Sequence, residues 1–124
     1  MKAAIIILSD PNSEQQESLG RVFNALAAAY DFKEAGKEVK IIFQGTGTRW
    51  PSKLIDKDHP AHSLYTAVAD KIAGASCGCA DVFGAAEDIK KVGLELITDN
   101  AVPGTTGLPS YKDLLEEGFT IINF

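Results

Sequence analysis

Two cysteines, Cys77 and Cys79, are the residues of this chain best suited to covalent chemistry, and Gly78 alone separates them. They stand where a short apolar strand is expected to lead into a helix. Thiolate is the reactive form of cysteine, and the free N–H groups of a helix N-terminus favour it. Gly78 would let the backbone turn without a side chain in the way. We therefore predict a functional thiol here, the two sulfurs acting as attacking and resolving thiols or as metal ligands. The alternative is that both cysteines pack as small hydrophobic residues.

A glycine-rich segment between two expected elements supplies the next candidates. Gly45 and Gly47 could present backbone N–H groups to an anion, although the segment has neither the P-loop pattern nor the third glycine of a dinucleotide-binding loop. Arg49 is a cation that would stabilise a thiolate lying on the same rim. Trp50, the only tryptophan, is a candidate ligand platform or oligomer contact.

Metal and acid–base sites have weaker support. His59, His62 and the two cysteines are potential soft-metal ligands, but zinc sites normally use Cys-x-x-Cys and this pair is Cys-x-Cys. We interpret both histidines as exposed residues at a helix start, and we predict no metal and no cofactor. Asp10 is either an acid or ligand group at the site or a residue that ends the first strand.

Composition limits the class of protein. The 124 residues suffice for one domain, 1–124, and 45% hydrophobic with 23% charged residues is ordinary for a globular protein. A net charge of −5 without a lysine or arginine cluster argues against a nucleic-acid partner. The first apolar run is too short for a membrane span, and one cysteine pair is no disulfide framework. We expect a cytoplasmic protein with no membrane partner.

Strand and helix patterns alternate along the chain. A capping-box pair, Ser13 and Gln16, marks the first helix start, and Gly36, Gly74 and Gly93 follow helical stretches as caps. This alternation predicts a three-layer α/β/α sandwich with a five-stranded, mostly parallel sheet of flavodoxin-like architecture. The expected strands are 3–8, 39–43, 75–77, 94–97 and 120–124, and the expected helices are 13–36, 53–57, 60–74, 81–91 and 109–117.

In such a sheet every strand-to-helix loop lies at the carboxyl edge. The topology therefore predicts one rim that brings together Asp10, Arg49, Trp50, the two thiols and Asn100. The candidate site is therefore expected at this rim, whatever its reaction.

Several stretches together resemble a known family. They are an apolar first strand closing in Ser-Asp-Pro, the alanine-rich segment 21–29, and the segments 36–43, 77–84 and 118–124. They resemble the DsrE/DsrF-like family of small bacterial and archaeal proteins, which includes the DsrEFH/TusD-type sulfur-relay proteins. The resemblance implies one α/β/α domain that assembles into homo- or hetero-oligomers, commonly trimers or hexamers. It also implies a persulfide on one cysteine after the third strand. Cys77 matches that cysteine by its place, and Cys79 by its spacing to Gly84.

The leading hypothesis is a homo-oligomeric sulfur carrier in which Cys77 or Cys79 accepts a persulfide sulfur from a donor protein and passes it to an acceptor protein. A second thiol would instead favour a redox or sulfide-releasing role. An alternative is a non-catalytic module that binds a nucleotide or flavin-like ligand at the glycine-rich rim. A third hypothesis is a structural component of a larger assembly.

Overall fold

Five parallel strands form one sheet in the order β4-β3-β2-β1-β5 in this computed structural model, which describes residues 1–124. The chain steps outward from β1 to β4 and then returns to place β5 on the free side of β1. The five-stranded parallel sheet predicted from the alternating pattern is confirmed. The strands are β1 (Lys2–Ile7), β2 (Glu38–Phe43), β3 (Ile72–Ser76), β4 (Leu96–Ile97) and β5 (Phe119–Asn123).

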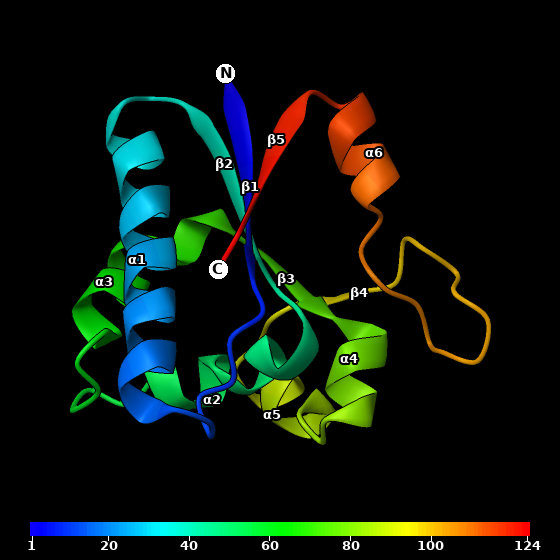
Figure 1. Cartoon of the computed structure of the whole chain (residues 1–124), viewed down its shortest axis with the longest axis horizontal. Helices are drawn as coiled ribbons and strands as arrows, with labels where there is room; N and C mark the ends of the chain where they lie inside the picture. The colour runs from blue at the N-terminus through cyan, green and yellow to red at the C-terminus, as the bar shows by residue number, and fades with distance from the viewer.

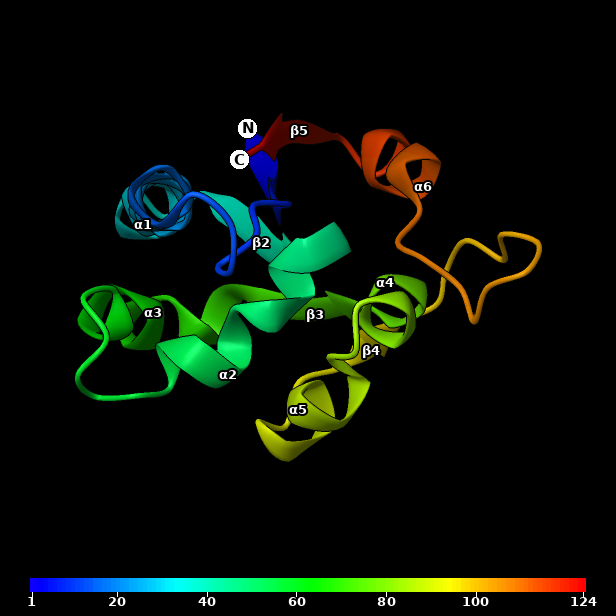
Figure 2. The same cartoon turned by 60° about the horizontal axis from the view of Figure 1, so that its bottom comes forward.

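Helices cover both faces of the sheet (Figures 1 and 2). Right-handed crossovers in one direction along the sheet leave their helices on one face, and the reversed step from β4 to β5 leaves α6 on the other. The predicted three-layer sandwich is therefore confirmed. The helices are α1 (Gln15–Glu34), α2 (Pro51–Leu54), α3 (His62–Ala67), α4 (Cys77–Val82), α5 (Ala86–Lys91) and α6 (Tyr111–Glu116), with 3-10 helices η1 (Gly45–Arg49) and η2 (Ala69–Lys71).

The central strand β1 explains why the first apolar run does not alternate with polar residues. Side chains of a strand alternate between the two faces, and both faces are covered here. Ile5 and Ile7 belong to the larger core on the α1 face, whereas Ala4 and Ile6 belong to a smaller core that α6 closes. All four are fully buried.

None of the predicted helix starts coincides with the one in the structure, and the first and third helices show why. The capping box is not formed: Ser13 Oγ bonds the Asp10 carbonyl oxygen in a turn, and α1 begins two residues later, at Gln15. Similarly, the expected helix 60–74 is shortened to α3 and η2. Gly74 is no helix cap but lies inside β3, with a φ of +149° that a side chain would strain.

The expected helix 81–91 is in fact two helices. Gly84, at φ +71°, separates α4 from α5. The first of the two, α4, begins at Cys77, four residues earlier than predicted. Both cysteines therefore lie in its first turn. No helix of the structure combines the length and the apolar character needed to cross a membrane.

Candidate functional site

The two thiols lie at the carboxyl edge of the sheet, directly after β3. Buried Ser76 is the N-cap of α4, and its Oγ accepts a hydrogen bond of 3.3 Å from the backbone N–H of Cys79. Such a cap satisfies one of the free N–H groups of the first turn. Cys77 and Cys79 are both half-buried and both free thiols. This placement after the third strand is the one predicted.

Cys77 has polar neighbours that the sequence reading missed. Thr106 Oγ1 lies 3.1 Å from Cys77 Sγ and 2.6 Å from Asp81 Oδ2. Cys77 and Asp81 are four residues apart on α4 and therefore share one face of the helix. That face lies against the loop that carries Thr106. Once α4 begins at Cys77, the Cys-x-x-x-Asp spacing is a signal that could have found Asp81; nothing local marks Thr106.

Cys79 belongs to a different environment. Burial raises the pKa of the Tyr111 phenol above its ordinary value, and the nearby Cys79 raises it further. The Cys79 thiol is therefore near enough to Tyr111 for its charge to act on the phenol. Residues two apart on a helix do not face each other, and a disulfide needs Cβ atoms that do. The helical geometry therefore argues against a disulfide between the two cysteines, and a joint role of the two sulfurs stays a prediction.

The glycine between the cysteines is required by a neighbouring loop. Its N–H donates a 2.7 Å hydrogen bond to the Gly107 carbonyl oxygen. A Cβ at Gly78 would stand 2.9 Å from Leu108 Cδ1 and 3.1 Å from that oxygen. Gly78 is not among the glycines with positive φ. Its role is the close approach of the loop, which holds Thr106 against Cys77, and not a backbone turn as predicted.

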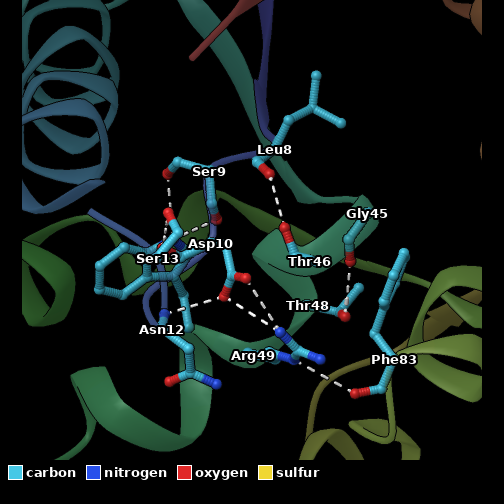
Figure 3. A network of polar contacts seen from close by, with 11 residues as sticks. Leu8, Ser9, Asp10, Asn12, Ser13, Gly45, Thr46, Thr48, Arg49 and Phe83 are labelled. Carbon is cyan, nitrogen blue, oxygen red and sulfur yellow. Dashed lines mark hydrogen bonds and ion pairs between the residues drawn. The ribbon is translucent and has the colours of Figure 1, made fainter. Parts of the chain in front are cut away.

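Arg49 links three segments of the rim (Figure 3). Its guanidinium lies 3.1 Å from Asp10 Oδ2 and donates a 3.3 Å hydrogen bond to the Phe83 carbonyl oxygen. These contacts join the loop after β1, η1 and the end of α4. Arg49 lies on the predicted rim, and its guanidinium hydrogen bonds go to Asp10 and Phe83 and not to a thiol, so its stabilisation of a thiolate stays a prediction. Asp10 is at the predicted rim, with its carboxylate engaged by Arg49.

The glycine-rich segment packs against β1. Gly45, with φ +59°, opens η1, and a Cβ at Gly47 would overlap the carbonyl oxygen of Ile7. Trp50 is 2% exposed and donates a 2.8 Å hydrogen bond from Nε1 to the Ser9 carbonyl oxygen. It is a core residue, so the prediction that it serves as a ligand platform or an oligomer contact is wrong. Its indole packs in the larger hydrophobic core with residues of α1 and α2.

Both histidines are half-buried and tied to the backbone rather than exposed. His59 Nδ1 accepts a hydrogen bond of 3.1 Å from the Ala61 N–H, and His62 Nδ1 lies 2.8 Å from the Leu54 carbonyl oxygen. The prediction of exposed rings is wrong because the segment between α2 and α3 folds back on Trp50. No three His, Cys, Asp or Glu side chains converge as a set of metal ligands.

Comparison with known proteins agrees with this architecture. The model of the DsrE/DsrF-like family matches residues 1–124. The uncharacterised protein MJ0733 of Methanocaldococcus jannaschii is 32% identical over 122 residues, which is 98% of this chain and 94% of that protein. A conserved protein of unknown function, BT1422 from Bacteroides thetaiotaomicron, superposes with a TM-score of 0.61 at 21% identity, covering 99% of this chain and 94% of the other. That structural likeness concerns the fold alone.

Proposed function

The chain belongs to the DsrE/DsrF-like family, and from this premise we propose that it is a sulfur carrier whose Cys77 accepts sulfur as a persulfide. The observation that carries the proposal is the position of Cys77: first residue of α4, directly after β3, half-buried at the carboxyl edge. Family membership supports sulfur-relay chemistry, and this position is where a relay cysteine of the family is expected.

Cys77 is favoured over Cys79 by its surroundings. Its sulfur has a side-chain hydroxyl within 3.1 Å, on a loop held to α4 by the Gly78–Gly107 hydrogen bond. Such a fixed polar neighbour orients a reacting sulfur. Cys79 instead lies towards Tyr111. Because residues two apart on a helix do not share a face, we assign sulfur acceptance to Cys77 and do not assign release of sulfide to Cys79.

The transfer is a thiol–disulfide type exchange. The Cys77 thiolate attacks the outer sulfur of a donor persulfide, forms a new S–S bond, and the donor leaves as a thiolate that takes a proton from solvent. An acceptor thiolate then attacks the outer sulfur held on Cys77. Cys77 leaves as a thiolate, and no net oxidation or reduction takes place. No metal or organic cofactor takes part in this sequence.

Intact-mass measurement tests the proposal. Reduced wild type, Cys77→Ser and Cys79→Ser are each exposed to a small-molecule persulfide donor. We expect wild type and Cys79→Ser to gain the mass of one sulfur, removable by a reductant, and Cys77→Ser to gain none. Sulfur uptake that depends on Cys79 alone would reassign the acceptor, and no uptake by any variant would refute the carrier function.

The carrier is further proposed to work as a homo-oligomer, a trimer or hexamer, between a donor and an acceptor protein in the reducing cytoplasm. Family resemblance supports the assembly. Exposed apolar side chains also support it, since Val82 and Phe83 at the end of α4 are both open to solvent next to the thiol site. Such side chains are suited to a protein partner that must approach Cys77.

A further inference from the structure

The Thr106 hydroxyl stands between an acid and a thiol, and it has one proton for two neighbours. Its Oγ1 is 2.6 Å from Asp81 Oδ2 and 3.1 Å from Cys77 Sγ. A carboxylate is acceptor-only, so the Thr106 proton must point to Asp81 while Asp81 is ionised. A contact of 2.6 Å is typical of such a charge-assisted hydrogen bond. The Thr106 lone pair then faces the sulfur, and only a protonated thiol can satisfy it.

From this geometry we propose that Asp81, acting through Thr106, holds Cys77 as a protonated thiol, and that neutralising Asp81 activates the sulfur. The inference rests on the proposed role of Cys77 as the acceptor. Once Asp81 loses its charge, the Thr106 hydroxyl rotates and donates a hydrogen bond to the sulfur, which stabilises the thiolate. Cys77 gives its own proton to solvent, Thr106 keeps one proton throughout, and no bond other than S–H is broken.

Backbone hydrogen bonds hold the Thr106 loop near Cys77, whereas the Asp81 carboxylate is open to solvent. The Gly78–Gly107 hydrogen bond and the paired N–H and C=O groups of Asn100 and Leu108 fix the loop against α4. Asp81, by contrast, is exposed, and Thr106 is its hydrogen-bond partner. A proton, or a cationic side chain of a docking protein, can therefore reach Asp81 without disturbing the loop.

Other titratable groups near the pair do not replace Asp81. Cys79 acts electrostatically on Tyr111 of α6, and neither residue makes a hydrogen bond to Thr106. Asp99 precedes the Asn100–Leu108 bridge in the loop. Arg49 is held by the end of α4, where it donates a hydrogen bond to the Phe83 carbonyl oxygen. Its guanidinium is paired with Asp10. Asp81 is exposed and its carboxylate accepts a hydrogen bond from Thr106, so this hydroxyl is the group on which its charge acts directly.

The test is the rate of Cys77 alkylation by neutral iodoacetamide between pH 6 and 9.5, in a Cys79→Ser background so that one thiol reacts. Asp81→Asn removes the charge, and its amide can donate to Thr106. We expect a rate at pH 7 that is about three to ten times higher, because a hydrogen bond donated by Thr106 to the sulfur favours the thiolate. In a Thr106→Val background the same substitution should change the rate less than about twofold. Thr106→Ser should restore the full effect.

Glu87→Gln on α5 is the matched control, since it also removes one negative charge from an exposed side chain and should leave the rate unchanged. Thr106 is exposed, so its substitution removes no core packing, and melting curves verify folding. An equal gain in both backgrounds would show a through-space charge effect and overturn the inference, as would no gain in either. Alkylation reports ionisation and not sulfur uptake. A failed uptake experiment with a positive result here would therefore refute the carrier function and leave the restraint standing.

Discussion

The ring of His59 is held in one protonation state by its contacts. Nδ1 accepts the Ala61 N–H, and the ring meets Trp50 edge to face with centroids 6.0 Å apart. Burial lowers the pKa of His59 below its ordinary value, the nearby Lys53 and His62 charges lower it further, and the Asp56 carboxylate partly offsets this. A proton on Nδ1 would break the hydrogen bond. The folded protein therefore binds this proton less readily than the unfolded chain.

This predicts a loss of stability on acidification that depends on His59. The stabilising contribution is complete above the unfolded pKa of about 6.5 and decreases as pH falls below it. His59→Asn keeps an acceptor for the Ala61 N–H but does not titrate, so its free energy of unfolding should fall less between pH 7.5 and pH 5.5. Urea unfolding at both values measures the difference, with His62→Asn as the control: it removes only the smallest cause of the His59 shift and should retain most of the dependence. Equal pH dependence in wild type and His59→Asn would contradict the prediction.

At the scale of elements, two glycines that look alike in the sequence have opposite roles. Gly20 lies in the middle of α1, and nothing stands within 4 Å of where its Cβ would be. Gly47 lies in η1, where a Cβ would overlap the carbonyl oxygen of Ile7. Gly20→Ala should raise the free energy of unfolding by about 1 kcal/mol, the difference in helix propensity.

Gly47→Ala should lower the free energy of unfolding by about 2 kcal/mol or more, because the backbone of η1 or β1 must move to make room for the methyl group. Chemical denaturation of both variants tests the pair, and destabilisation by Gly20→Ala would contradict the packing described for α1.

Elements were predictable where one local pattern decides them. The apolar run of β1 and the glycine after α1, with φ +69° at Gly36, read correctly from the sequence. The break between α4 and α5 at Gly84 was not predicted, because Val82, Ala85 and Ile89 keep a helical spacing on both sides of the glycine. Gly74 was assigned as a helix cap from its place after an apolar helical pattern. Its actual role is to let the backbone at Glu95, next to β4, approach β3 closely, and the sequence pattern does not reveal such a tertiary contact.

The candidate site was predictable in its place but not in its contacts. Parallel topology puts Asp10, Arg49 and Cys77 at one edge, and the structure agrees. Thr106 is brought to Cys77 by a loop 29 residues further along the chain, and no periodicity encodes that. Arg49 was assigned to the thiols by charge alone, whereas the closer carboxylate of Asp10 takes its guanidinium. Sequence patterns locate an edge, and tertiary packing selects partners along it.

For the whole molecule, strand order bears on the ligand-binding alternative. Ligands of open α/β sheets bind where the strand order reverses, here between β1 and β5. Cys77 follows β3, two strands away from that point. The start of α1, beside the reversal, has Glu14 as its N-cap and Glu17 in its first turn, and Arg21 pairs with Glu17 at 2.7 Å. Acidic residues at a helix N-terminus oppose a phosphate group. The architecture therefore favours thiol chemistry at the rim over nucleotide or flavin binding.

An outward face of α1 is the surface on which self-association is best tested. Phe23 and Tyr30 are 43% and 42% exposed, and their spacing of seven residues puts them on one side of the helix. Burying two aromatic side chains on association would contribute several kcal/mol.

We predict that light scattering finds three or six copies of the 13.2 kDa chain, and that Phe23→Glu shifts the assembly towards smaller species. Asn24→Glu adds the same charge at the next, exposed position and should not. A monomeric wild type would refute the oligomer. An assembly that Phe23→Glu leaves intact would place the interface elsewhere, with the apolar pair at Val82 and Phe83 next to the thiol as the surface to test.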